Sequence, residues 1–388
     1  MAEFIEIKGG KPLSGTVVAS GAKNAALPQL IAALLTSDEC EFSNVPNLED
    51  VSLTISLLKH FGASVERCSD VVRVKVPALR ASEASYSLVK ALRASFWVLA
   101  PILARGGAAR VALPGGDAIG TRPVNIHLDA LSRMGADIKL KHGVVLATAP
   151  KGLKPAEVNF AFPSVGATHQ ILMAAALTPG RTVIRGAARE PEVVALADML
   201  AAMGADICGA GSNEIEICGV DQLGGVKLRL IGDRIEAGTY LLAAVATRGS
   251  ATVTGIAPEV YGEFLDSVGE IGASVVRGDD WVSVAATKNM QSADVSTAPF
   301  PGFATDMQAT MMAFLSTVPG VSTIEENVFE ARYAHASELA RMGADIEIED
   351  RVARISGVVR LSGAPVDGYD IRGAAALVVA GLAAEGTT

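Results

Sequence analysis

The chain has 388 residues, of which half are apolar and 19% are charged, and its formal net charge is −9. At roughly 150 residues per domain, this length predicts two or three folding units, and the apolar content excludes a disordered chain. No stretch supplies the roughly 18 to 20 apolar residues of a membrane span. The basic residues form no run, which argues against nucleic acid as a partner.

The first residues, MAEFIEIKGG, alternate apolar and polar side chains, and we predict a strand over residues 3–18. They lack the basic head and the apolar core of a secretory signal. We therefore expect a cytoplasmic protein.

The cysteines give no sign of a metal site or of disulfides. They show no CxxC pair and no nearby histidine at ligand spacing, at Cys40, Cys68, Cys208 and Cys218. Four such thiols in a long chain are typical of buried or idle cysteines.

An internal repeat runs through the sequence at a period of roughly 70 residues. The dipeptide Gly-Ala, followed by a polar-apolar alternation, recurs at Gly62, Gly135, Gly204, Gly272 and Gly343. Each copy follows an apolar stripe at helical spacing, so the glycine fits the end of a helix and the alternation fits a strand.

A second helix opens each copy, after a small-residue turn near residues 21–23, 93–95, 165–167, 237–239 and 306–308. A sixth opening lies at 371–374, and we expect the sixth copy to be truncated because the sequence stops at Thr388. Segments such as 91–104 and 373–384 are apolar nearly all round, which requires burial on every side. We therefore predict helices inside and sheets outside.

Three copies per domain is the simplest division. The first domain then covers residues 21–230, and the second covers 1–20 with 231–388, so that the N-terminal strand completes the second domain. Many other α/β folds also alternate helices and strands, but the regular period favours the repeat.

Basic residues occur where helix dipoles favour acids, because Lys23, Arg93 and Arg372 each lie at the start of an apolar helix. A cation next to free backbone N–H groups makes an anion site. The third copy has the small-residue turn 164–167 there instead. A single such cation is also compatible with a snorkelling surface residue.

The loop 113–123 reads Leu-Pro-Gly-Gly-Asp-Ala-Ile-Gly-Thr-Arg-Pro, and its glycines surround Asp117, with Arg122 five residues further on. This pattern predicts a lid that carries an acid and an anion clamp. An ordinary glycine turn with a solvated aspartate remains the alternative.

These segments together resemble the enolpyruvyl transferase family over essentially the whole chain. The matching pieces are Ser20-Gly-Ala-Lys-Asn-Ala-Ala-Leu-Pro28, Arg93-Ala-Ser, the loop 114–123, Pro163-Ser-Val-Gly-Ala-Thr168, Ala188-Arg-Glu-Pro-Glu192, Asp233-Arg-Ile-Glu236, Thr305-Asp-Met-Gln308 and Arg341-Met-Gly-Ala. The resemblance implies an α/β fold of two inverse α/β barrels, helices inside and sheets outside, each built of three repeats, with an active-site cleft between the domains.

The resemblance also implies a reaction. Phosphoenolpyruvate would donate its enolpyruvyl group to the 3-hydroxyl of UDP-N-acetylglucosamine, phosphate would leave by addition and elimination, and the product would enter peptidoglycan synthesis at its first committed step. It implies no cofactor, no metal and no obligatory protein partner.

By position, the resemblance gives Asp117 as the acid, Asp306 as the base, and Lys23 and Arg122 as a phosphate clamp. The implied substrate-binding set is Lys23, Asn24, Arg93, Arg122, Pro123, Val124, Asn125, Ile126, Ser164, Val165, Gly166, Asp306, Val328 and Arg372. Asp306 alone would also fit a helix N-cap.

The sequence departs from the family pattern at several positions. Most members carry cysteine where this chain has Asp117, and the antibiotic fosfomycin alkylates that cysteine, so resistance is expected here. Asn125 replaces a common acid, Phe162 a lysine of some members, and Ala331 a frequent asparagine. Members also continue beyond the position of Thr388 with another phosphoenolpyruvate-binding arginine. Two alternatives stay open. One is a shikimate 3-phosphate enolpyruvyl transferase, which has the same fold and a similar set of cations. The other is a catalytically silent UDP-sugar-binding paralogue, which Asn125 and the absent terminal arginine support.

Overall fold

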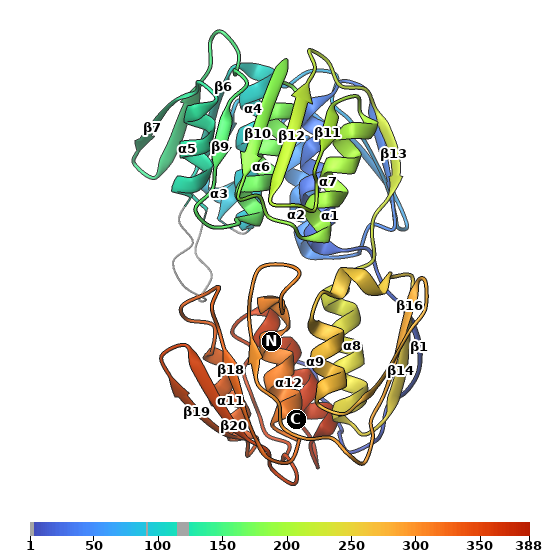
Figure 1. Cartoon of the computed structure of the whole chain (residues 1–388). Coiled ribbons are helices and arrows are strands. Elements are labelled where there is room, and N and C mark those ends of the chain that lie inside the picture. Colours follow the sequence, from blue (N-terminus) through green and yellow to red (C-terminus); the bar gives the residue numbers. More distant parts are fainter. Residues whose placement is uncertain (1–3, 91, 115–123) are drawn as a thin grey trace. The chain divides into compact units, whose positions relative to one another are not determined.

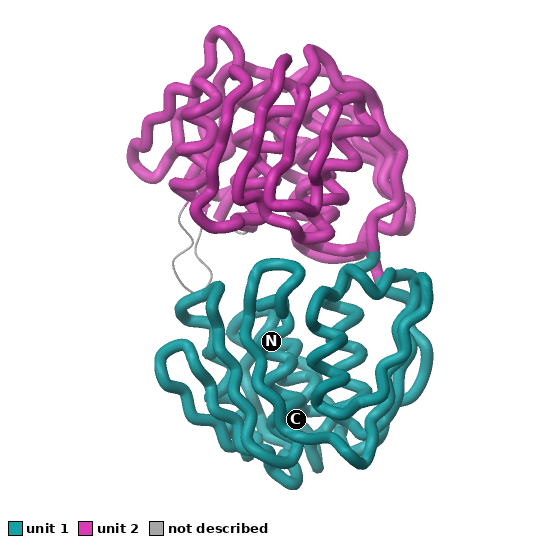
Figure 2. The backbone as a smooth tube through the Cα atoms, in the orientation of Figure 1, with its two compact units in different colours: residues 1–19, 117–121, 232–388 teal, residues 20–116, 122–231 magenta. Residues whose placement is uncertain are grey.

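A computed structural model of the chain describes residues 4–90, 92–114 and 124–388. The described residues form two compact units, shown in Figure 2. Unit 1 contains residues 4–19 and 232–388, and unit 2 contains 20–90, 92–114 and 124–231. The domain boundaries expected from the repeats, 20/21 and 230/231, lie one residue from these. Each unit is described on its own below.

The five Gly-Ala dipeptides each lie between a helix and a strand, as the repeat predicts. Their glycines have positive φ angles of 101°, 89°, 119°, 97° and 90°, at Gly62, Gly135, Gly204, Gly272 and Gly343. A side chain is disfavoured in this left-handed conformation, so glycine ends the helix there. The helices that end here are α2 (Glu49–His60), α5 (Asn125–Arg133), α7 (Pro191–Ala202), α9 (Phe264–Glu270) and α11 (Ala334–Arg341).

Each of these five repeats contributes three strands to a four-stranded sheet, whose fourth strand comes from outside the three, and Figure 1 shows the sheets on the outside of the units. In unit 2 the sheets run β13 (Val226–Arg229), β2 (Glu39–Ser43), β4 (Val71–Lys75), β3 (Ser64–Cys68); β5 (Glu83–Ala84), β6 (Ala108–Ala112), β8 (Val144–Thr148), β7 (Asp137–Lys141); and β9 (Glu157–Asn159), β10 (Gly180–Arg185), β12 (Glu214–Gly219), β11 (Asp206–Cys208). In unit 1 they run β1 (Ser14–Val18), β14 (Ser250–Thr254), β16 (Trp281–Ala285), β15 (Ser274–Arg277); and β17 (Val295–Ser296), β18 (Val321–Glu325), β20 (Val352–Ser356), β19 (Asp345–Glu349).

The first strand in each of these orders pairs in parallel with its neighbour, and the other pairs are antiparallel. The N-terminal strand β1 pairs with β14, with Ser14 opposite Ser250, so it joins the sheet of the fourth repeat. The expected strand over residues 3–18 is too long. It is confined to β1, because Gly10 has a φ of +79° and Pro12 has no backbone N–H to donate.

Very apolar helices fill the inside of each unit, as Figure 1 shows. They are α1 (Lys23–Ala32), α4 (Leu99–Gly106), α6 (Val165–Ala176), α8 (Arg234–Ala246), α10 (Gln308–Leu315) and α12 (Ile371–Ala383), with the short α3 (Tyr86–Val89) beside them in the chain. The α/β architecture with inner helices and outer sheets is therefore confirmed. In the described part of the chain the strands form separate sheets and not one continuous hydrogen-bonded barrel.

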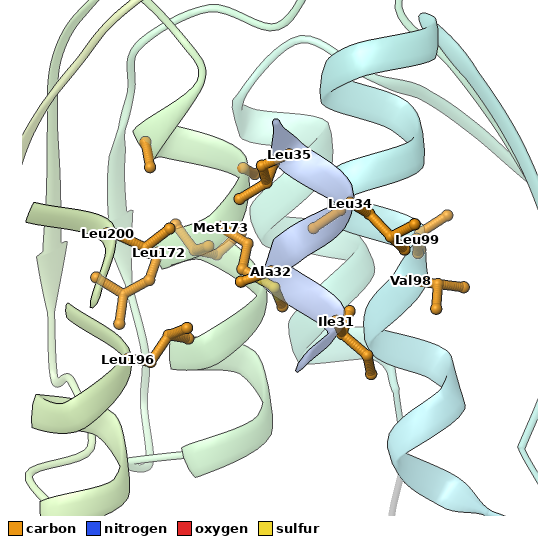
Figure 3. Close-up of a cluster of buried hydrophobic side chains, with 14 of the residues drawn as sticks. Ile31, Ala32, Leu34, Leu35, Val98, Leu99, Leu172, Met173, Leu196 and Leu200 are labelled. Carbon is orange, nitrogen blue, oxygen red and sulfur yellow. The ribbon is translucent and has the colours of Figure 1, made fainter. Parts of the chain in front are cut away.

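Figure 3 shows how the inner helices of unit 2 meet. Side chains of the segment 31–35 pack on one side against Val98 and Leu99, and on the other against Leu172, Met173, Leu196 and Leu200. These side chains are buried, which contributes about 1.5 to 3 kcal/mol for each large one.

The helix expected over residues 91–104 begins differently. A 3₁₀ turn, η2 (Arg93–Val98), comes first, and α4 starts only at Leu99. Pro101 explains the late start, because proline is tolerated only in the first turn of an α-helix.

Candidate active site

Lys23 is the first residue of α1, where the sequence places it. Its Nζ lies 3.6 Å from Oδ2 of Asp50, in the first turn of α2, and the Lys23 side chain is 18% exposed. Ala22, the residue before α1, supplies no side-chain cap to the helix. Lys23 is therefore a partly buried cation in a loose ion pair. Asn24 follows it and is half-buried.

Arg93 opens η2 and is half-buried, and the aromatic residues after it contact two histidines of unit 2. Phe96 lies edge-on to His127, with ring centroids 5.6 Å apart, and Trp97 lies edge-on to His169 at 5.1 Å. The start of η2 is thereby fixed against α5 and α6.

The turn at residues 164–166 forms the start of α6, as predicted. The Oγ of Ser164 accepts a hydrogen bond from the backbone N–H of Ala167 at 3.3 Å. Gly166 fits closely, because a Cβ there would lie 3.3 Å from both Nε2 of His127 and Nε1 of Trp97 and would require these rings to shift. Ser164, Val165 and Gly166 are half-buried, so a ligand can reach this helix start.

Two buried histidines lie beneath this turn. Burial lowers the pKa of His127 to about 4, although its hydrogen bond to Gln170 opposes the shift, and Nδ1 lies 3.1 Å from the Gln170 Oε1. Burial also lowers the pKa of His169 to about 4. Both rings are therefore neutral at pH 7, and they line the site as packing and hydrogen-bonding groups.

Val124, Asn125 and Ile126 lie at the beginning of α5. Val124 is the residue before the helix, and Asn125 is exposed while its neighbours are half-buried. Asp117, Arg122 and Pro123 lie outside the described residues, so the predicted lid and its acid remain predictions.

Asp306 of unit 1 lies between two arginines. Its Oδ1 is 2.7 Å from Nη2 of Arg332, and its Oδ2 is 2.7 Å from Nη2 of Arg372. Asp306 belongs to the 3₁₀ turn η4 (Thr305–Met307), and its side chain is 26% exposed. The structure thus brings two predicted residues together and adds Arg332, which the sequence did not single out.

The helix-cap reading of Asp306 is wrong, because α10 begins after it without a side-chain cap and both Asp306 oxygens face guanidinium groups. The anion site expected from backbone amides at the start of α12 also needs correction. Oδ1 of Asp370 accepts hydrogen bonds from the backbone N–H groups of Arg372 and Gly373, at 2.9 and 3.0 Å. A carboxylate of the chain already occupies that position, so Arg372 acts through its side chain.

Val328 lies in a loop that a buried glutamate holds. Its backbone N–H donates to Oε1 of Glu326 at 2.9 Å, and the N–H of Phe329 donates to the same oxygen at 3.0 Å. The one sequence feature that could have pointed to Glu326 and Arg332 is that they lie close to Val328 in the chain. Neither lies in a periodic pattern, so the repeat does not mark them.

A hollow of about 430 Å³ lies in unit 2, and two of its lining residues come two and three positions before Lys23. It is lined by Ser20, Gly21, Asn44, Val45, Pro46, Asn47, Arg67, Ser69 and Asp70. Its lining contains no predicted site residue, so its size alone does not identify it as the active site.

Within the described residues, no helix is both long and apolar enough to cross a membrane. The same part of the chain contains no group of three or more histidine, cysteine, aspartate or glutamate side chains placed to hold a metal ion. All four cysteines are free thiols, of which Cys40 is buried and Cys68 and Cys208 are exposed.

Known proteins resemble the chain over its whole length. The family model of EPSP synthase (3-phosphoshikimate 1-carboxyvinyltransferase) matches residues 7–388. UDP-N-acetylglucosamine 1-carboxyvinyltransferase of Geotalea daltonii is 48% identical over 98% of this chain and 91% of its own, and that of Desulfosudis oleivorans is 49% identical over 99% and 92%.

Solved structures agree with these sequence matches. The enolpyruvyl transferase NikO from Streptomyces tendae has a TM-score of 0.85 and 25% identity, over 98% of this chain and 91% of its own. An EPSP synthase from Acinetobacter baumannii has a TM-score of 0.75 at 18% identity, over 98% and 92% of the two chains, which shows the same fold.

Proposed function

Since the chain belongs to the EPSP synthase family of enolpyruvyl transferases, we propose that it is an enzyme that transfers the enolpyruvyl group of phosphoenolpyruvate to the 3-hydroxyl of UDP-N-acetylglucosamine. The observation that carries this proposal is 48% identity to a UDP-N-acetylglucosamine 1-carboxyvinyltransferase over 98% of the chain. The reaction is the first committed step of peptidoglycan synthesis. A silent paralogue and a shikimate 3-phosphate transferase are not favoured by these relatives.

The reaction requires three proton transfers and no redox step. A base takes the proton of the sugar 3-hydroxyl while its oxygen attacks C2 of phosphoenolpyruvate, and an acid protonates C3. The C2–O bond to phosphate then breaks, a proton leaves C3 to restore the double bond, and inorganic phosphate departs. Such acid and base groups contribute roughly 10²- to 10⁴-fold each.

Asp306 is the proposed base. Two guanidinium groups at 2.7 Å favour the ionised form of its carboxyl, which is the form that accepts a proton. Its partial exposure leaves it accessible to a substrate hydroxyl. Arg372, on the same carboxylate, is the proposed contact for phosphoenolpyruvate.

The proposed phosphate clamp consists of Lys23 and Arg122, with Asp117 as the acid that protonates C3. Lys23 supports this assignment because its ion pair with Asp50 spans 3.6 Å, so a phosphate can compete for the ammonium group. Asp117 replaces the thiol that fosfomycin alkylates, and we therefore expect resistance to fosfomycin.

The nucleotide sugar is proposed to bind along helix starts. The α6 start offers backbone amides around Gly166 and a partial positive charge, which suit a diphosphate. The further contacts in this proposal are Asn24, Arg93, Pro123, Val124, Asn125, Ile126, Ser164, Val165 and Val328. The enzyme would act in the cytoplasm on two small molecules, with no obligatory protein partner.

Phosphate release tests the function directly. Phosphoenolpyruvate is mixed with the protein and either UDP-N-acetylglucosamine or shikimate 3-phosphate, and Asp306→Asn serves as the inactive control. We expect release with the sugar nucleotide alone. Release with shikimate 3-phosphate only, or with neither acceptor at any protein concentration, contradicts the proposal.

A further inference from the structure

The carboxylate of Asp306 is aimed by its two arginines. Each of its oxygens receives one charge-assisted hydrogen bond of 2.7 Å, from Arg332 and from Arg372. Such bonds are short and directional. The direction of the proposed base therefore depends on what holds the two guanidinium groups.

Arg332 is held from behind. Its side chain is 7% exposed, and its guanidinium lies over the ring of Phe329, 5.1 Å from the centroid. Nη1 of Arg332 donates to Oγ1 of Thr305 at 2.8 Å, while Nη2 donates to Asp306. Thr305 therefore fixes the side of the fork that faces away from Asp306.

The hydrogen bonds of the Thr305 hydroxyl can run in only one direction. It accepts from Arg332, because a guanidinium has no acceptor, and it donates to Oε2 of Glu326 at 2.9 Å. The Glu326 side chain is fully buried, and its Oε1 accepts from Oγ1 of Thr297 at 3.0 Å and from two backbone N–H groups. Four donors thus converge on this one carboxyl.

We propose that Thr305 and Glu326 are positioning residues, which hold Arg332 so that it aims the Asp306 carboxylate at the substrate hydroxyl. This rests on the proposed role of Asp306 as the base. The chain of donors runs from Arg332 through Thr305 to Glu326, and the same glutamate also fixes the loop that carries Phe329 beneath the guanidinium. Neither residue touches the reacting atoms.

Three variants test the proposal. Thr305→Val keeps the shape but removes the hydroxyl, Thr305→Ser keeps the hydroxyl, and Glu326→Gln presents an N–H where Thr305 needs an acceptor. Thr317→Val is the matched control, because it removes a buried threonine hydroxyl of unit 1 that bonds to the backbone of Phe314.

We expect kcat to fall about ten- to hundredfold in Thr305→Val and in Glu326→Gln, with KM for phosphoenolpyruvate changed less, because a misaimed base slows the chemical step. Thr305→Ser should recover most of the loss. The acid limb of the pH profile of kcat should move to higher pH in Thr305→Val, because a displaced Arg332 stabilises the ionised form of the Asp306 carboxyl less. Thr317→Val should keep the wild-type kcat and profile.

A crystal structure of Thr305→Val provides a readout that does not depend on activity. We expect the Arg332 guanidinium to leave Asp306 in that variant and to stay in Thr305→Ser. An Arg332 that remains on Asp306, or equal kinetics in the valine and serine variants, overturns the proposal. If the wild type releases no phosphate with either acceptor, the proposed function fails, and the crystal structures still decide the positioning claim. If Glu326→Gln does not fold, the threonine pair carries the test alone.

Discussion

The starts of α6 in unit 2 and of α12 in unit 1 satisfy their free backbone N–H groups in different ways. Both open an inner helix with a glycine in the first turn, and both are capped by the side chain of the preceding residue. Ser164 caps α6 with a neutral hydroxyl and one hydrogen bond, whereas Asp370 caps α12 with a carboxylate and two. The charge of Asp370 offsets the helix dipole at α12.

The difference teaches where each unit can attract an anion. At α6 the dipole is not offset by an acid in the first turn, so the backbone itself favours a phosphate. At α12 the backbone is already satisfied, so an anionic substrate depends on the side chain of Arg372. The same sequence feature, a small-residue turn before an apolar helix, therefore supports two kinds of site.

The largest expected effect on activity comes from the site in unit 1 that side chains form. Asp306→Asn keeps the shape of the cluster but removes the base, and we expect kcat to fall roughly 10²- to 10⁴-fold. Phosphate release measures the fall, and thermal unfolding checks that the variant is folded. A kcat within threefold of the wild type would show that Asp306 is not the base.

The next largest effect is a loss of stability at acid pH, which should be greater in unit 2 than in unit 1. Burial lowers the pKa of His127, His169 and, in unit 1, His335 to about 4. The unfolded chain has the ordinary histidine pKa near 6.5, so it binds more protons than the folded chain between these values, and stability falls as the pH drops from about 6.5 to 4. Each histidine contributes at most about 3.4 kcal/mol to that loss.

Unit 2 holds two of these three buried histidines, so we expect it to lose protection first. Hydrogen exchange at pH 7, 5.5 and 4.5 measures the protection of the backbone amides in each unit, when each rate is divided by that of the unfolded chain at the same pH. Equal losses in both units, or a greater loss in unit 1, would contradict the assignment of the neutral histidines.

The start of α1 is of a third kind, because it has no side-chain cap and its first residue is the cation Lys23. Lys23→Ala should lower kcat/KM for phosphoenolpyruvate about ten- to hundredfold, because a charge-assisted contact to phosphate contributes roughly 1.5 to 3 kcal/mol. Binding of the sugar nucleotide should change less. Lys59→Ala, which removes an exposed lysine of α2, is the matched control. Similar kinetics in the two variants would make Lys23 a structural cation.

The smallest effects concern the caps themselves. Ser164→Ala and Asp370→Ala should each lower the free energy of unfolding by about 0.5 to 2 kcal/mol, and Asp370→Ala should lie at the upper end because it loses two hydrogen bonds. Urea unfolding measures both. The reverse order would mean that charge on the α12 cap adds nothing.

The regular parts of the fold follow from the sequence. Gly62 and its four counterparts predict helix ends correctly, because only a residue without Cβ occupies those φ angles easily. The strand over 3–18 and the helix over 91–104 were overextended, since apolar patterning ignores what Gly10, Pro12 and Pro101 do to the backbone. Local conformational rules correct both ends.

The polar cluster of unit 1 follows from the sequence only in part. Asp306 and Arg372 occupy marked positions at repeat openings, but Arg332 and Glu326 lie in an irregular loop. Their importance comes from burial and from long-range hydrogen bonds, which no local pattern encodes. The cap at Asp370 is visible in the sequence, because aspartate is a common N-cap and lies directly before the helix that Arg372 opens.

The pairing of β1 with β14 has a consequence for synthesis of the protein. Ser14 leaves the ribosome roughly 240 residues before its partner Ser250, which at about 5 to 20 residues per second is a wait of roughly 10 to 50 s. All of unit 2 is made in that interval and can fold meanwhile. The unpaired N-terminal strand is an exposed edge during this time, a state that favours aggregation. Production of the protein should therefore depend on chaperone supply, or on slow expression at low temperature, more than its finished fold suggests.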